Sequence, residues 1–233
     1  MSSGYRLRSG DTGPIQQSGV TCGSACLTVA RMLVNPAFAR WITTGQGPRA
    51  DAPEGATEKE RFAAYERVVM RRTNRLFAGG GRLNVPWPRA LGTPPWGARK
   101  ELEFGASKRG TEYELEVVRH RTRAGLRKAH ARLIEVVADG EPALLYIGNA
   151  VLPRHVTLVL PGDGDRLLDV YDPATGRVSL LDEERFADRA LGIAGWDVPW
   201  ITVQPDGTRR VQAFGFSTAI SSASRTSGVS ASA

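Results

Sequence analysis

The stretch from Gln16 to Leu27 constrains this chain more than any other. It places Cys22 at the start of a segment with helical apolar spacing and Gln16 six residues earlier. Backbone N–H groups in the first turn of a helix have no intrahelical partner, so they stabilise a thiolate placed there. Gly23 and Ser24 leave room for a carbonyl group to approach the sulfur. These residues predict a nucleophilic cysteine, with Gln16 donating to the oxyanion that its attack creates.

The alternative is a structural role for both cysteines. Free cysteines are among the most buried residue types, so Cys22 and Cys26 also suit the core side of a buried helix. Two cysteines four residues apart on one helix are poorly placed to bridge each other. Neither they nor the three histidines (His120, His130 and His155) show the spacing of a metal site. We therefore expect no disulfide, no metal and no other cofactor.

Length and charge narrow the class of protein. The 233 residues suffice for one domain with a real core. The net charge of +7 allows an acidic partner, but nearly all basic residues are arginine, a bias more typical of genome composition than of a nucleic-acid site. There is no apolar run long enough to span a bilayer, and residues 1–6 lack the apolar region of a signal peptide. We expect no membrane association, and either a cytoplasmic location or export without a cleaved signal.

Helical patterns dominate the first part of the chain. Apolar spacing predicts a helix from Cys22 to Val34, which Asn35 and Pro36 end. A capping box at Thr57–Glu60 starts a second helix, which the glycines at 79–81 should end. Loops are expected at 43–56 and around one short helix within 82–110, and a further helix at 122–138, with His130 at its surface or boundary.

Strand patterns dominate the second part. A short strand at 113–117 precedes the last long helix, and apolar runs at 143–147, 156–160, 167–171 and 177–180 then predict an antiparallel sheet. Asp182 should cap a short helix over 183–189, and the strand at 200–203 should close the sheet. The Ser/Ala/Gly-rich tail at 221–233 is predicted to be disordered. We expect an α+β fold, with one domain over 1–220 and a largely helical and loop insertion at about 43–140.

His155 and Asp172 supply the base that a nucleophilic cysteine needs. His155 directly precedes one predicted strand, and Asp172 directly follows its neighbour. A turn at 162–165 makes the two strands a hairpin, which brings these ends together. A carboxylate beside an imidazole holds the ring in the right tautomer and orientation. The alternative is a histidine at a strand end and an aspartate that opens an Asp-Pro turn.

These motifs, taken in order, resemble the papain-like cysteine peptidase fold, and within it the C39 peptidase-like family. The resemblance rests on Gln16 through Cys22-Gly23, on His155-Val156, and on the Asp-Pro-x-x-Gly pattern that starts at Asp172. It covers about the first forty residues and 141–205. It implies that Cys22 is the nucleophile, His155 the general base and acid, Asp172 the orienting group, and Gln16 the oxyanion donor. Thr21 departs from the family, which often has an acidic residue before the cysteine, and no transporter segments accompany the domain.

The hypothesis that follows is a thiol hydrolase acting on a peptide or amide bond of a peptide or protein substrate. The insertion would form one wall of the cleft, and its basic character suggests an acidic or extended polar substrate. Two other hypotheses stay open: a catalytically silent papain-like domain that binds a peptide, and a secreted effector that uses the same site for deamidation or acyl transfer. A nucleic-acid-binding role rests on net charge alone, and we do not favour it.

Overall fold

The computed structural model describes residues 4–47, 55–74, 77–78, 82–83, 87–88, 91–162, 164 and 166–207. The tail predicted to be disordered, 221–233, lies outside the described residues. Among the helices that the structure does describe, none has both the length and the apolar character that crossing a bilayer requires.

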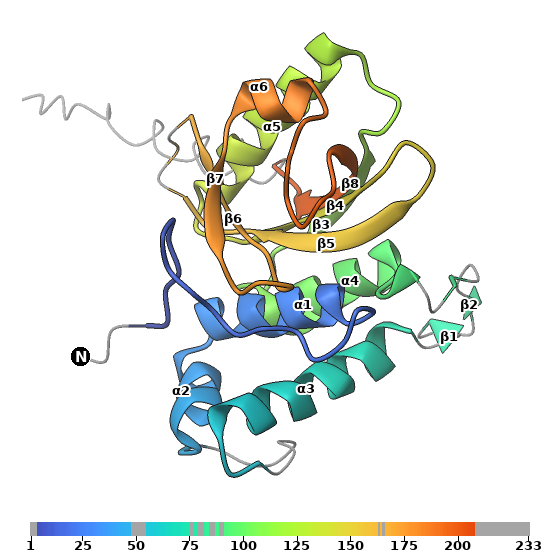
Figure 1. Ribbon diagram of the computed structural model, residues 1–233. Coiled ribbons are helices and arrows are strands. Elements are labelled where there is room, and N and C mark those ends of the chain that lie inside the picture. Colours follow the sequence, from blue (N-terminus) through green and yellow to red (C-terminus); the bar gives the residue numbers. More distant parts are fainter. Residues whose placement is uncertain are drawn as a thin grey trace, which may run out of the picture.

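A six-stranded antiparallel sheet lies between two layers of helices (Figure 1). Its strand order is β3-β8-β4-β5-β6-β7, with bounds β3 Tyr113–Val117, β4 Ala143–Gly148, β5 Pro153–Val159, β6 Leu168–Tyr171, β7 Val178–Leu181 and β8 Val198–Pro205. One layer holds α1 Cys22–Val34, α2 Pro36–Thr44, α3 Glu58–Thr73 and α4 Pro95–Glu101, which continues as a π-helix over Leu102–Ala106. The other holds α5 Arg123–Val137 and α6 Glu183–Ala187, and the short strands β1 Phe77–Ala78 and β2 Arg82–Leu83 pair separately.

The centre of the sheet is buried on both faces, and strand β4 shows how the sequence achieves this. Leu144 and Tyr146 belong to the apolar cluster shared with α1 and α3, whereas Ala143, Leu145 and Ile147 belong to the cluster shared with α5. Side chains alternate between the two faces of a strand, so an unbroken apolar run serves two cores. The predicted α+β class is confirmed, with the cysteine-bearing helix packed on an antiparallel sheet.

Helix α1 is packed on most sides, and ten of its thirteen residues are buried. It packs against β5 on one side and α3 on another, and Ala25, Cys26 and Val29 are fully buried. Its bounds are those that the apolar spacing predicts. In Figure 1 it runs directly beneath the sheet.

Several local expectations are wrong. Asn35 ends α1, but its side chain also accepts a hydrogen bond from the Phe38 N–H and so caps α2, which continues into the expected loop as far as Thr44. Helix α3 starts at its capping box but ends at Thr73, before the glycines at 79–81. His130 is buried rather than at the surface, because it packs on Phe186.

Local sequence patterns also did not predict where two of the strands lie in the sheet. Strand β8 does not close the sheet but lies inside it, between β3 and β4. Strand β3 falls within the range expected as an insertion, yet it pairs along its whole length with β8, from Tyr113 opposite Pro205 to Val117 opposite Ile201. Within the same range, α3 and α4 pack against α1, whereas α5 lies in the other helical layer.

Candidate active site

Cys22 is the first residue of α1, as the sequence predicts, and only 3% of it is exposed. The preceding Thr21 does not cap the helix with its side chain, because its hydroxyl bonds with the backbone of Ser18 instead. The first turn also carries no acidic residue. The partial positive charge of the helix N-terminus is therefore left to act on the Cys22 sulfur.

His155 and Asp172 lie side by side at one end of the β5–β6 pair. Asp172 directly follows β6, as predicted, but His155 lies within β5, which begins at Pro153 instead of after the histidine. The strands pair antiparallel with Leu158 opposite Tyr171. His155 Nε2 donates to Asp172 Oδ1 over 2.7 Å, and both side chains are buried.

The Asp172 carboxylate is fixed from its own turn. The Ala174 N–H donates to Oδ1 over 3.0 Å, and the Thr175 hydroxyl donates to Oδ2 over 2.9 Å. Burial opposes the charged form of this carboxyl, but the hydrogen bonds from His155 and Ala174 outweigh it and hold the pKa of Asp172 below its usual value. The carboxylate therefore stays ionised beside the imidazole.

Both Asp172 and Cys22 interact with the His155 ring. Burial lowers the pKa of the imidazole, but the hydrogen bond to Asp172, the interaction with Cys22 and the charge of Asp172 raise the pKa of His155 to about 9. With Nε2 held by Asp172, the other ring nitrogen, Nδ1, is the atom left to exchange a proton with Cys22. The structure thus brings together three of the four predicted site residues.

Gln16 approaches the same place through its backbone. Its N–H donates to the carbonyl oxygen of Pro173 over 2.8 Å, directly after Asp172. The Gln16 side-chain oxygen is enclosed and has no hydrogen-bond partner among the residues that the structure describes. Its action as an oxyanion donor to Cys22 stays a prediction.

Cys26 lies one turn further along α1 and is a different kind of thiol. It is fully buried, and its sulfur donates to the carbonyl oxygen of Val156 over 3.4 Å. Burial raises the pKa of Cys26 well above its ordinary value. It therefore has the core role that was the alternative for both cysteines.

Sequence reasoning missed a glycine beside the sulfur. Gly92 has a φ of +71°, and a Cβ added to it would lie 3.8 Å from Cys22 Sγ and 2.8 Å from the carbonyl oxygen of Val20. The next residue, Thr93, packs closely on Gly23: a Cβ added to Gly23 would lie 2.6 Å from the Cβ of Thr93. The only signal was a glycine in a proline-rich loop, a pattern also typical of ordinary turns.

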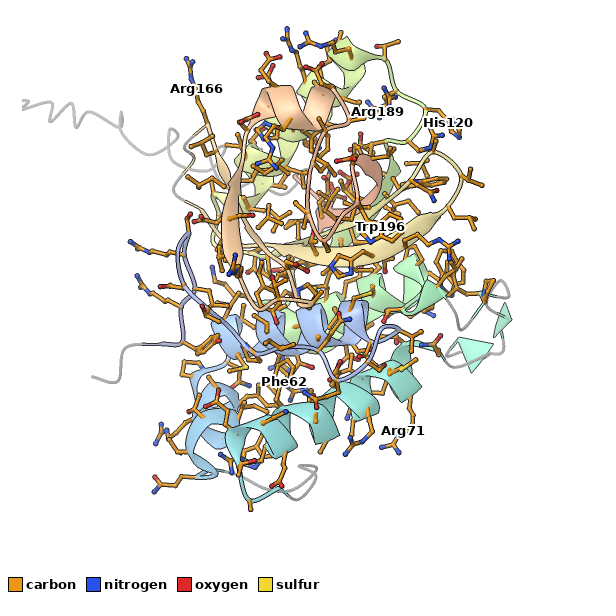
Figure 2. The ribbon with its side chains drawn as sticks, viewed as in Figure 1. Phe62, Arg71, His120, Arg166, Arg189 and Trp196 are labelled. Atoms are coloured by element: carbon orange, nitrogen blue, oxygen red, sulfur yellow. The ribbon has the colours of Figure 1, made fainter. Side chains whose placement is uncertain are left out.

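Sequence reasoning also missed Glu66, on α3. Both of its carboxylate oxygens accept the N–H of Gln17, and its side chain is fully buried. A signal was present, because Glu66 lies four residues after Phe62 and three before Val69, on the apolar face of its helix. Figure 2 shows Phe62 on that face, between α3 and α1, whereas Arg71 points away from the molecule.

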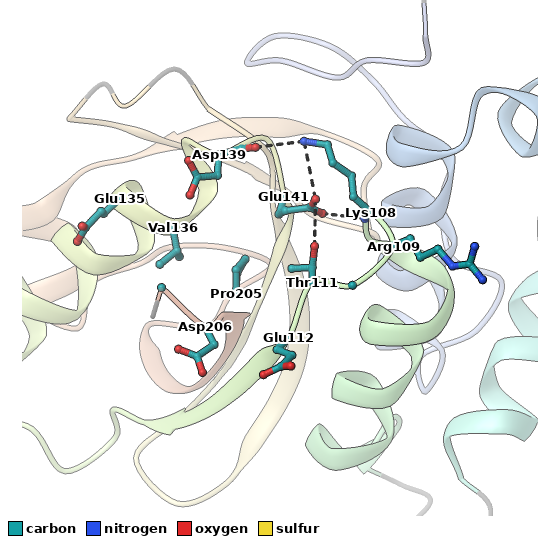
Figure 3. A pocket seen from close by; sticks show the side chains of 12 residues that line it. Lys108, Arg109, Thr111, Glu112, Glu135, Val136, Asp139, Glu141, Pro205 and Asp206 are labelled. Carbon is teal, nitrogen blue, oxygen red and sulfur yellow. Dashed lines mark hydrogen bonds and ion pairs between the residues drawn. The ribbon is translucent and has the colours of Figure 1, made fainter. Parts of the chain in front are cut away.

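Other polar groups lie away from this site. His120 is exposed on the loop after β3 (Figure 2). A pocket of about 320 Å³ between α5 and the residues after the π-helix is lined by Lys108, Glu135 and Glu141 among others, and it shares no lining residue with the site (Figure 3). Among the described residues, no group of three or more His, Cys, Asp or Glu side chains is placed to hold a metal ion.

Comparison with known proteins gave limited similarities. No protein-family model matches the sequence, and no curated protein matches it significantly. The peptidase domain of Streptococcus ComA, a bifunctional ABC transporter in a quorum-sensing pathway, is 14% identical, with a TM-score of 0.38 over 84% of this chain and 98% of that one. The Pseudomonas avirulence protein AvrPphB is 11% identical, with a TM-score of 0.44 over 82% of this chain and 96% of that one.

Proposed function

We propose that this protein is a thiol hydrolase that cleaves a peptide or amide bond. The observation that carries the proposal is the buried His155, which bonds to Asp172 and also interacts with Cys22 at the start of α1. A buried imidazole with a carboxylate on one side and a thiol on the other has the arrangement of a nucleophile, its base and an orienting group.

The reaction proceeds in two stages. His155 takes the Cys22 proton, and the thiolate adds to the substrate carbonyl carbon to give a tetrahedral oxyanion. The Gln16 side chain and the Cys22 N–H donate hydrogen bonds to that oxyanion. The protonated His155 then gives its proton to the leaving amine as the C–N bond breaks, which leaves a thioester on Cys22.

Water completes the reaction in the second stage. His155 accepts a proton from the attacking water, and the thioester breaks to release the acid and restore the thiol. The same site would support deamidation or acyl transfer to an amine, because only the bond attacked or the incoming nucleophile differs. A peptide or protein is the proposed substrate. The chemistry on these residues requires no metal or cofactor.

The test is the alkylation rate of each cysteine by iodoacetamide across pH, followed peptide by peptide with mass spectrometry. Because Cys22 is only 3% exposed, a small reagent is needed. We expect Cys22 to react fast below pH 7 in the wild type, and His155→Ala to abolish that fast reaction. Cys26 is the internal control, since burial keeps it protonated and slow.

His120→Ala is the matched control, because it removes an exposed histidine outside the site. It should leave the fast reaction of Cys22 unchanged. If both cysteines react slowly in the wild type, with ordinary thiol behaviour, the catalytic proposal is wrong, and a domain that only binds a peptide takes its place.

A further inference from the structure

Glu66 is a buried acid at an unexpected place, the interface between α3 and the loop that leads to Cys22. Its side chain is fully buried, and it forms no ion pair with any residue that the structure describes. Burying a carboxyl group is costly unless hydrogen bonds compensate for lost hydration. An apolar residue could be buried there at a lower cost in free energy. The role of Glu66 is therefore indicated by the groups that its carboxylate binds.

Glu66 binds the loop directly after Gln16. The Gln17 N–H donates to both of its oxygens, over 3.3 and 3.2 Å. The preceding N–H, that of Gln16, donates to the carbonyl oxygen of Pro173 over 2.8 Å. Two successive peptide groups are thus tied to different parts of the fold, one to α3 and the other to the turn that carries Asp172.

Glu66 also reaches the other end of the same loop. Burial raises the pKa of its carboxyl, and its interactions with the Thr21 side chain and the Gln17 N–H partly offset the rise. Thr21 directly precedes Cys22. One side chain therefore contacts the residue after the proposed oxyanion donor and the residue before the proposed nucleophile.

We propose that Glu66 is a positioning residue that holds the loop from Gln17 to Thr21 so that Gln16 and the Cys22 N–H keep a common geometry toward the oxyanion. This inference rests on the proposed function. Glu66 does not touch the reacting atoms; it acts through the loop between Gln16 and Cys22. Because oxyanion donors act only when aimed at the position where charge develops, releasing the loop should slow acyl transfer.

The test compares two reactions of Cys22, of which only one passes through an oxyanion. Acylation by p-nitrophenyl acetate passes through an oxyanion, whereas alkylation by iodoacetamide is a displacement that forms none. Glu66→Met removes both acceptor oxygens while keeping an unbranched side chain of similar size. We expect it to slow acylation about tenfold or more, within the hundred- to thousand-fold limit for loss of a whole donor. Alkylation should stay within about twofold of the wild-type rate, since the thiol–imidazole pair is intact.

Glu141→Met is the matched control. Glu141 is also a buried glutamate with a raised pKa, and it accepts the Lys108 N–H over 3.1 Å, but it lies in the separate pocket of Figure 3. It should carry the same kind of folding penalty without slowing acylation. If Glu66→Met does not fold, Glu66→Gln takes its place in the test. It keeps one acceptor oxygen, so we expect it to slow acylation about threefold.

A double-mutant cycle separates positioning from general disruption. If Glu66 acts through the oxyanion donors, then adding Glu66→Met to Gln16→Ala should cause a much smaller further loss of acylation than Glu66→Met causes in the wild type. Wild-type acylation in Glu66→Met, or full additivity in the cycle, would overturn the inference. If the wild type reacts with p-nitrophenyl acetate no faster than Cys22→Ala does, the proposed function itself is wrong. The failure of the inference and the failure of the proposed function are therefore distinct.

Discussion

The charge on His155 gives the most direct physical test of the site, and Asp172→Asn is the change that probes it. Asparagine keeps the size of the side chain and one oxygen that accepts from His155 Nε2, but it removes the negative charge. The amide oxygen can replace Oδ1 as the acceptor for the Ala174 N–H, and the Thr175 hydroxyl can turn to accept from the amide NH2 group that replaces Oδ2, so the turn should survive. The effect should therefore be electrostatic.

The magnitude follows from the pKa of His155, about 9 against an ordinary value of 6.5. The difference corresponds to about 3 kcal/mol in favour of the protonated ring, at about 1.4 kcal/mol for each pH unit. Burial works against this, so Asp172 and Cys22 together supply more than the difference. We expect Asp172→Asn to lower the pKa of His155 by about one pH unit or more.

The assay is a histidine titration by long-range proton–nitrogen NMR, which needs no substrate. His155 is assigned by its absence from His155→Gln. His130 is an internal reference, because burial lowers its pKa below the ordinary value and it lies on α5, in the helical layer that does not hold Cys22. Asp172→Asn should move the His155 transition and leave that of His130 in place.

The same shift has a consequence for the pH profile of the reaction. A protonated His155 must donate to the leaving amine, so the wild-type acyl transfer from an amide should be lost as the pH rises through about 9. In Asp172→Asn that loss should occur at lower pH. A wild-type His155 that titrates near 6.5, or one whose transition does not move in Asp172→Asn, would refute the reasoning.

Two further variants test the packing beside the nucleophile and the cap of α3. Gly92→Ala should destabilise the protein by more than the control Gly10→Ala. Both glycines have positive φ, but only a Cβ at Gly92 would lie 2.8 Å from a backbone oxygen, that of Val20. The melting temperatures of the two variants measure the difference, and equal shifts would contradict the prediction. Gly92→Ala should also slow Cys22 alkylation by crowding the sulfur. Thr57→Ala should cost about 1 kcal/mol by removing the N-cap of α3, measured by urea unfolding, and a change below about 0.3 kcal/mol would contradict that role.

The parts of this structure that were predictable from sequence depend on interactions between residues close in the chain. The capping box of Thr57 and Glu60 forms as expected, because both hydrogen bonds lie within one turn. The helix from Cys22 to Val34 follows from its apolar spacing. The proximity of His155 and Asp172 followed from a hairpin, in which adjacent strands are paired by a short connection.

The parts that were missed depend on contacts between distant residues. Strand β8 has the pattern of any half-buried strand, and only its pairing with β3 and β4 places it inside the sheet. His130 is in the core because α6, which follows it by some fifty residues, covers it with Phe186. The start of β5 at Pro153 was missed because proline disfavours central strands, yet here it is the first residue, where it is tolerated.

The two cysteines show why a site can be argued from structure more firmly than from composition. Both lie on α1 and both are nearly or fully buried, so exposure does not separate them. What separates them is the neighbouring charge and the position on the helix. Cys22 is at the N-terminus and interacts with His155, whereas Cys26 has only a carbonyl acceptor at its sulfur and lies where a thiolate would be repelled by Cys22, Asp172 and Glu66. Burial, reinforced by these neighbouring charges, therefore keeps Cys26 protonated, and a faster reaction at Cys26 than at Cys22 would contradict the electrostatic account of the site.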